Sequence, residues 1–106
     1  MKCDIKIKAS HLIIPAELAR RILQQTNNVY VSYKEDHDIL MVSPEENTWF
    51  PKLHSSKVFM VKSKDQAGTK SIAIREVIID HEIDDCDRNL PCIANEEKKF
   101  LRIELG

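Results

Sequence analysis

Residues 6–18, which read KIKASHLIIPAEL, carry the clearest structural pattern in the chain. Polar and apolar side chains alternate over residues 4–8, and this two-residue period predicts a half-buried strand. Residues 9–11 are small or polar and predict a turn, and residues 12–14 predict a second, apolar strand. Pro15 then suits the first turn of a helix, since its fixed φ is helical and its missing N–H is not needed there. The stretch therefore predicts strand, turn, strand and helix in close succession.

The helix is expected over residues 16–25, with Leu18, Ile22 and Leu23 inward and Arg20, Arg21 and Gln24 outward. Residues 29–33 are β-branched or aromatic and predict a third strand. A polar hairpin loop over 34–38 leads to a fourth strand at 39–43. Residues 44–56 interrupt the pattern with two prolines and the pair Trp49-Phe50, and we interpret them as a packed connector.

The same order of elements recurs in the second half of the chain. Strands are expected at 57–62, 71–74 and 100–105, with a polar loop at 63–69, helical turns at 75–79 and an acidic loop at 80–89. Residues 90–93 predict a weaker strand, because Pro91 favours an edge or a strand start. An offset of 60 places Leu12 on Ile72, and an offset of 61 places residues 39–42 on residues 100–103. This near-constant offset indicates an internal duplication, with repeats at about 1–43 and 57–106 in a single domain spanning 1–106.

The run from Lys6 to Leu18 resembles the opening of the AbrB/SpoVT-type domain, in which an apolar strand ends in Ile-Pro before a short helix. Two such units interleave their hairpins into one barrel in that family, and MraZ carries both units in one chain. The resemblance implies a β-rich α+β fold, a small swapped-hairpin barrel of two ββαββ repeats. It also implies a non-enzymatic transcriptional regulator or DNA-associated protein.

The turns that carry DNA contacts in the family differ in this chain. The family usually has Gly-Arg before the apolar strand, whereas this chain has Ser10-His11 and Thr69-Lys70. An arginine there would make bidentate contacts to phosphate or guanine. The residues expected to contact the DNA backbone are instead Lys6, Lys8, His11, Arg20, Arg21 and Lys70. The alternative is a protein-interaction module of the same fold that has lost DNA binding.

Charge and composition limit the function classes. The net charge is −1 and the two halves of the chain are both nearly neutral, so the basic excess typical of non-specific nucleic-acid binders is missing. Two glycines exclude a Gly-rich phosphate loop. Three cysteines, an odd number, argue against a disulfide framework and favour a reducing cytoplasm. No run is apolar enough to span a membrane, and a homo-oligomer could form through the barrel or a Trp49/Phe50 surface.

Catalytic and metal chemistry have weak signals. His81, Asp84, Cys86 and Cys92 could supply zinc ligands, but the usual Cys-x-x-Cys and His-x-x-x-His spacings are missing. The cysteines and histidines form no local signature of a nucleophile and its base. We therefore expect no catalytic residues, no cofactor and no resident metal, with the metal site kept as a third hypothesis.

Overall fold

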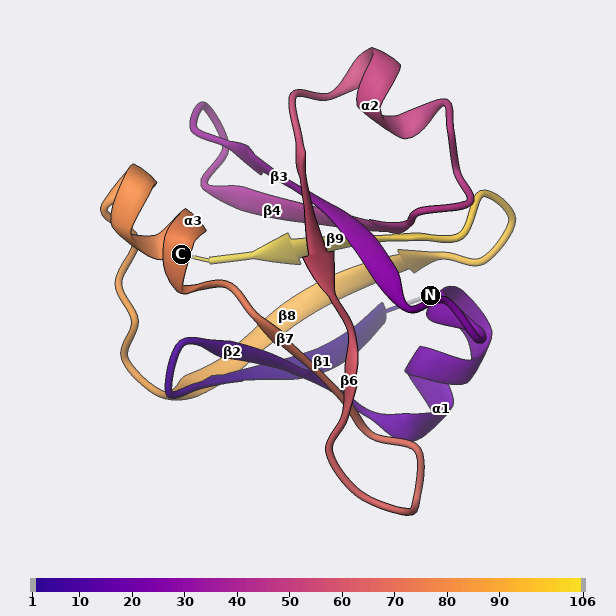
Figure 1. Ribbon diagram of the computed structural model, residues 1–106. Helices are drawn as coiled ribbons and strands as arrows, with labels where there is room; N and C mark the ends of the chain where they lie inside the picture. The colour runs from indigo at the N-terminus through magenta and orange to yellow at the C-terminus, as the bar shows by residue number, and fades with distance from the viewer. Residues whose placement is uncertain (1, 106) are drawn as a thin grey trace.

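A computed structural model, which describes residues 2–105, shows a small, nearly closed barrel of antiparallel strands with few helices (Figure 1). The strands are β1 (Lys2–Lys8), β2 (His11–Ile14), β3 (Asn28–Lys34), β4 (Ile39–Pro44), β5 (Lys57–Met60), β6 (Lys62–Ser63), β7 (Lys70–Ala73), β8 (Arg88–Asn95) and β9 (Phe100–Glu104). The helices are α1 (Ala16–Leu18), the π-helical turn η1 (Ala19–Leu23), α2 (Phe50–Leu53) and α3 (Arg75–His81). The predicted β-rich barrel is confirmed.

The opening stretch folds as its pattern predicts. β1 and β2 form a hairpin in which Lys8 lies opposite His11, and Ala9 and Ser10 form the turn with φ of 50° and 62°. Two consecutive residues with positive φ match the right-handed twist of the strands they join. Ile5, Ile7, Leu12 and Ile14 face the core, and their exposed fractions do not exceed 1%. Their polar neighbours along β1 are exposed.

The predicted helix over residues 16–25 is shorter than expected and changes type. Pro15 precedes α1, and the Gln24 N–H donates to the Ala19 carbonyl at 2.8 Å, a bond that spans five residues and ends η1. Gln24 has a φ of 54°, which cannot continue a right-handed helix. The inward positions are those predicted, since Leu18, Ile22 and Leu23 are buried.

One extended segment nearly closes the barrel. The strands lie in the order β5-β3-β4-β9-β8-β1-β2-β7-β6, so β5 and β6 occupy the two edges of the sheet. These two strands are separated in sequence by Val61 alone. Residues 57–60 pair with β3 and residues 62–63 pair with β7. The segment 57–63 therefore joins both edges, which leaves little of the sheet edge open to pairing with another chain.

The connector packs against the outside of the barrel wall. Phe50 is 0% exposed yet does not belong to the cluster of buried residues inside the barrel. It packs on Tyr30 of β3, with ring centroids 6.1 Å apart, and Trp49 packs on Phe50 and on Phe100 of β9. The packing predicted for this connector is seen at Trp49 and Phe50, whereas its place between two repeats stays a prediction. Its aromatic pair covers the outer wall, and the Phe50 ring is not available as an exposed anchor for a partner.

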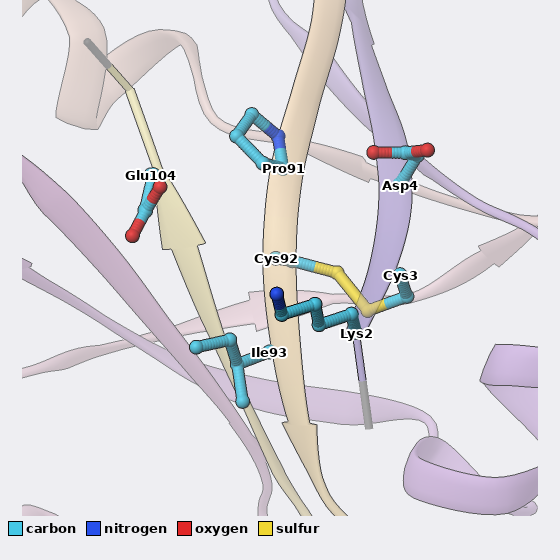
Figure 2. Close-up of a pocket in the computed structure, with 7 residues that line it drawn as sticks. All are labelled: Lys2, Cys3, Asp4, Pro91, Cys92, Ile93 and Glu104. Carbon is cyan, nitrogen blue, oxygen red and sulfur yellow. A yellow bond between two sulfur atoms is a disulfide. The ribbon is translucent and has the colours of Figure 1, made fainter.

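The expectation of no disulfide is wrong. Cys3 of β1 and Cys92 of β8 lie directly opposite each other, with Cα atoms 5.1 Å apart, and form a disulfide (Figure 2). This spacing is within the range that a disulfide requires. Cys86 is the free, exposed third cysteine. Disulfides persist mainly in oxidising compartments, so the odd cysteine count no longer supports the prediction of a cytoplasmic location.

Pro91 does not mark an edge strand, contrary to expectation. It lies within β8, which pairs with β1 on one side and β9 on the other. The ladder between β8 and β9 ends at Cys92 opposite Ile103, so at Pro91 the strand is paired with β1 alone. The proline is thus placed just beyond the doubly paired part of the strand.

Within residues 2–105, no helix combines the length and the apolar character needed to cross a bilayer.

Candidate nucleic-acid interface

Four lysines and one histidine gather on the outward side of the sheet formed by β1, β2, β7 and β6. We call this set, which consists of Lys6, Lys8, His11, Lys62 and Lys64, the basic face. Lys8, His11 and Lys64 line one shallow hollow together with Ala9, Ile13 and Ser71. Lys6 lies opposite Ile13, and Lys62 lies opposite Ser71, so both belong to the same side of the sheet.

The alternation of the strands is what directs these side chains outward. In β1, Ile5 and Ile7 enter the core, so Lys6 and Lys8 must point to solvent. In β2 and β7, the paired residues Leu12 and Ile72 are fully buried, so Ile13 and Ser71 face out. A slip of one residue would exchange the two sides. The burial of the isoleucines and leucines therefore fixes the position of the lysines.

Local hydrogen bonds order the β1–β2 turn at the edge of the basic face. The Nδ1 atom of His11 lies 2.7 Å from the Ala9 carbonyl oxygen. A carbonyl can only accept, so Nδ1 carries the proton and Nε2 is left for another partner. The Ala9 N–H donates to Asp87 Oδ1 at 3.0 Å, which ties the turn to the segment before β8.

The loop between β6 and β7 positions Lys64, at the other end of the basic face from the β1–β2 turn. Asp65 Oδ1 accepts the N–H groups of Ala67 and Thr69 at 3.0 and 3.1 Å. The bond from Thr69 is the main reason that the pKa of Asp65 lies below its ordinary value. These bonds curl the loop back so that the Lys64 N–H donates to the Thr69 carbonyl at 2.8 Å.

Asp65→Ala is expected to speed amide hydrogen exchange at Ala67 and Thr69, because both lose their acceptor. In the unchanged protein, acid should reduce the protection of these two amides, measured as their exchange relative to the intrinsic rate at each pH. Folding lowers the pKa of Asp65. The ionised carboxylate therefore stabilises the loop fully at pH values above the ordinary carboxyl pKa, and this stabilisation is lost as the pH falls through the lowered value. Asp36→Ala, in the exposed β3–β4 turn, is the matched control. Unchanged exchange in Asp65→Ala would contradict the role of this carboxylate.

Two other predicted contact residues lie beside a separate hollow. Arg20 of η1 and Lys70 line it together with Gln24, which follows η1, and Gly68 of the β6–β7 loop. Lys70 Nζ donates to Ser63 Oγ at 3.1 Å, and Arg20 reaches Glu17 at 3.8 Å. The loop 64–69 contributes residues to both hollows, so Arg20 and Lys70 border the basic face without joining it.

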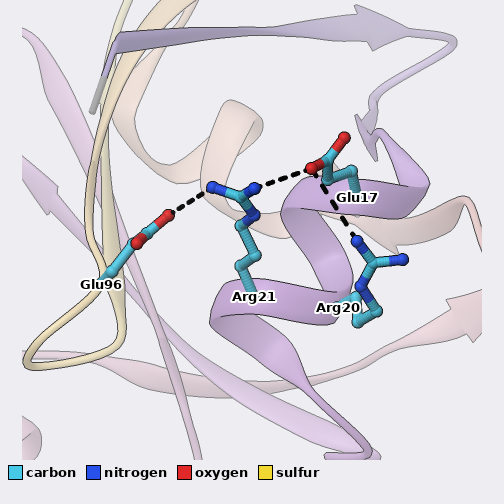
Figure 3. Close-up of polar contacts among 4 residues, drawn as sticks. All are labelled: Glu17, Arg20, Arg21 and Glu96. Atoms are coloured by element: carbon cyan, nitrogen blue, oxygen red, sulfur yellow. Dashed lines mark hydrogen bonds and ion pairs between the residues drawn. The ribbon is translucent and has the colours of Figure 1, made fainter.

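Arg21 is occupied by ion pairs (Figure 3). Its guanidinium donates to Glu17 Oε1 at 2.8 Å and to Glu96 Oε1 at 3.0 Å. The hydrogen bond to Glu96, followed by the charge of Glu17, raises the pKa of Arg21. The side chain thereby connects η1 to the turn between β8 and β9. Its predicted contact with DNA remains a prediction, and would require it to share or exchange these partners.

Lys62 and Lys64 were missed by the sequence prediction. Lys62 was expected at the end of the strand 57–62 and Lys64 in the polar loop 63–69, and neither was expected to contact DNA. The resemblance offered one signal, since its repeat unit pairs the first strand with the second in a hairpin. The offset of 60 would, however, have placed Gly68, not Lys62, opposite Ser71.

Acidic side chains near the basic face reduce its positive electrostatic potential. Asp4 lies on the same side of β1 and lines a hollow with Lys6 and Ile13, and Asp87 borders the β1–β2 turn. Asp65 adds a third carboxylate in the loop beside Lys64, and the four lysines still outnumber the three carboxylates. The face therefore holds a local positive charge that the net charge of −1 conceals.

The proposed zinc ligands are not brought together. Cys92 is bonded to Cys3, the His81 ring packs on Tyr33 at 4.8 Å, and Asp84 Oδ1 accepts the Cys86 N–H. Across residues 2–105, no three histidine, cysteine or acidic side chains form a group that could hold a metal ion.

No protein-family model matches this chain, and no curated protein or solved structure matches it either.

Proposed function

We propose that this protein is a non-enzymatic, AbrB- or MraZ-like DNA-associated protein, a transcriptional regulator built from two interleaved ββαββ repeats. The observation that carries the proposal is the basic face, where four lysines converge on one side of a sheet in a nearly neutral chain. Lysines contact phosphates as point charges and release counterions from DNA, so a compact group of them binds the backbone of a duplex.

The strand pairing supports the two-repeat scaffold. β1 pairs with β8 of the second half, and β5 pairs with β3 of the first half, so each half gives a strand to the other. If a twofold axis relates the two halves of the chain, a residue of one half lies directly opposite its equivalent in the other half only where that axis passes between the two residues. The offset of 60 equates Leu12 with Ile72, and the offset of 61 equates Met41 with Arg102. Both of these pairs lie directly opposite each other, in β2–β7 and in β4–β9.

Titration of a labelled duplex of about 25 base pairs tests the proposal by fluorescence anisotropy. With about four phosphate contacts, affinity should fall on the order of 100-fold between about 50 and 200 mM salt. Lys8→Ala combined with Lys62→Ala should weaken binding and make the salt slope shallower by about two. Lys52→Ala, on the exposed side of α2, is the matched control and should bind as the unchanged protein does.

No binding at low salt would contradict the proposal, because phosphate contacts are strongest there. The protein-interaction module would then be favoured. Its specific support is the apolar outer side of β5, where Val58 and Met60 are 52% and 65% exposed. Exposed apolar side chains that lie together are typical of protein contact surfaces.

A further inference from the structure

Residues 45–56, which we call the strap, fold over the outer wall of the barrel between β4 and β5. Phe50 fixes the middle of the strap, since its ring is fully buried between Tyr30, Trp49 and His54. Asn47 fixes its beginning. The Asn47 amide nitrogen donates to Ser43 Oγ at 2.8 Å and to the carbonyls of Lys98 and Lys99 at 2.9 Å.

His54 fixes the end of the strap, and its ring is held in an unusual way. The imidazole packs on the Phe50 ring with centroids 4.8 Å apart, and the His54 N–H donates to the Phe50 carbonyl at 2.9 Å. Its Nδ1 atom is buried and has no hydrogen-bond partner among the described residues. A neutral imidazole tolerates this, since one ring nitrogen needs no proton, but an imidazolium must donate from both nitrogens.

Two further polar groups in the part of the chain that the structure describes lack a hydrogen-bond partner when the strap lies on the barrel wall. Ser32 Oγ, on the same side of β3 as Tyr30, and Ser56 Oγ, at the end of the strap, are also buried without a partner within residues 2–105. Ser32 is 2% exposed. Each buried, unpaired polar group opposes the closed position, which apolar packing around Phe50 must therefore outweigh.

We propose that the strap is a pH-operated cover, which stays closed on the barrel wall while His54 is neutral and opens when His54 takes up a proton. Protonation places an N–H at a buried position that has no acceptor, and opening the strap lets water solvate it. The open form exposes Phe50, Trp49 and the outer wall of β3, which is a conditional apolar surface.

The charges around His54 act in the same direction. Burial is the main cause that lowers the pKa of His54, and the positive charge of Lys34 on β3 lowers it further. Phe50, from α2, is uncharged. Lys57, at the start of β5, is directed to Glu76 and Asp80 of α3 at 2.6 and 3.2 Å. Closing the strap lowers the pKa of His54. The closed form is therefore most stable at pH values above the ordinary imidazole pKa, and it loses stability as the pH falls from that value toward the lowered pKa.

Trp49, the single tryptophan of the chain, reports on the strap directly. Emission wavelength and quenching by acrylamide are measured on the whole protein from about pH 7.5 to about pH 5, a range that spans the imidazole titration. We expect a shift of the emission maximum to longer wavelength and a loss of protection from acrylamide. Far-UV circular dichroism should stay unchanged, because the barrel strands keep their pairing.

His54→Phe and His54→Gln remove the group that takes up the proton and should abolish the transition. His54→Phe also keeps an aromatic ring at residue 54, packed against Phe50. His37→Gln, in the exposed β3–β4 turn, should keep it. Phe50→Ala should give the acid-form spectrum already at about pH 7.5. A flat titration in the unchanged protein would overturn the proposal. So would an unchanged transition in His54→Phe, or a transition that coincides with loss of the circular dichroism signal.

Discussion

Replacing Cys3 with serine is expected to lower the free energy of unfolding by about 4 kcal/mol, because the disulfide closes a loop that spans 89 residues. Closing so long a loop removes much conformational freedom from the unfolded chain. For a domain of this size, the loss corresponds to a fall in Tm on the order of 15 °C. Chemical denaturation, followed by circular dichroism, measures the difference.

Cys86→Ser is the matched control, since Cys86 is exposed and free, and it should change stability by less than about 0.5 kcal/mol. Adding a thiol reductant to the unchanged protein should reproduce the effect of Cys3→Ser. A thiol count on the unfolded, unreduced protein should find a single free cysteine. If Cys3→Ser and Cys86→Ser unfold at the same denaturant concentration, the disulfide contributes no stability.

Leu12→Ala is expected to cost about 3 kcal/mol, because Leu12 is fully buried in β2 between β1 and β7. The cost combines lost apolar burial with the cavity left in a wall that neighbouring strands hold in register. Ile72→Ala removes the residue directly opposite and should cost a similar amount. Denaturant midpoints of the single variants and the double variant measure both the individual costs and their coupling.

Ile13→Ala, one residue along the same strand but on the outer side, is the control and should cost much less, about 1 kcal/mol or below. The double variant Leu12→Ala/Ile72→Ala should depart from additivity by at least about 0.5 kcal/mol, because the two residues face each other. Equal costs at residues 12 and 13 would contradict the inward and outward assignment of β2, and with it the outward direction of Lys6 and Lys8.

The basic face and the strap lie over different walls of one barrel. The basic face belongs to β1, β2, β7 and β6, whereas the strap covers β3 and contacts β9. Disabling one should therefore leave the other intact. His54→Phe should bind the duplex as the unchanged protein does, and Lys8→Ala should keep the tryptophan transition.

Most element positions could be predicted from the sequence, because they depend on local patterns. Alternation fixed β1 and β9, and Pro15 located the start of the first helix. The π-helical turn could not be predicted, since its five-residue hydrogen bond depends on how Ile22 and Leu23 enter the core. β6 was predicted only at Lys62, the end of the strand expected at 57–62, because Ser63 joins a strand only through its partner β7.

Alternation in residues 4–8 and 100–105 was enough to assign the inward residues of β1 and β9, because it is a local property of a strand. The strand, turn and strand predicted over residues 4–14 likewise placed Lys6, Lys8 and His11 on one hairpin. The tertiary structure alone decided that β1 pairs with β8. That pairing joins Cys3 to Cys92, 89 positions apart, and places Pro91 in a central strand. It also brought Lys62 and Lys64 beside Lys8 and folded Phe50 onto the outer wall. Such contacts arise from closing a barrel, where partners are chosen by the burial of a whole sheet and no local pattern identifies them.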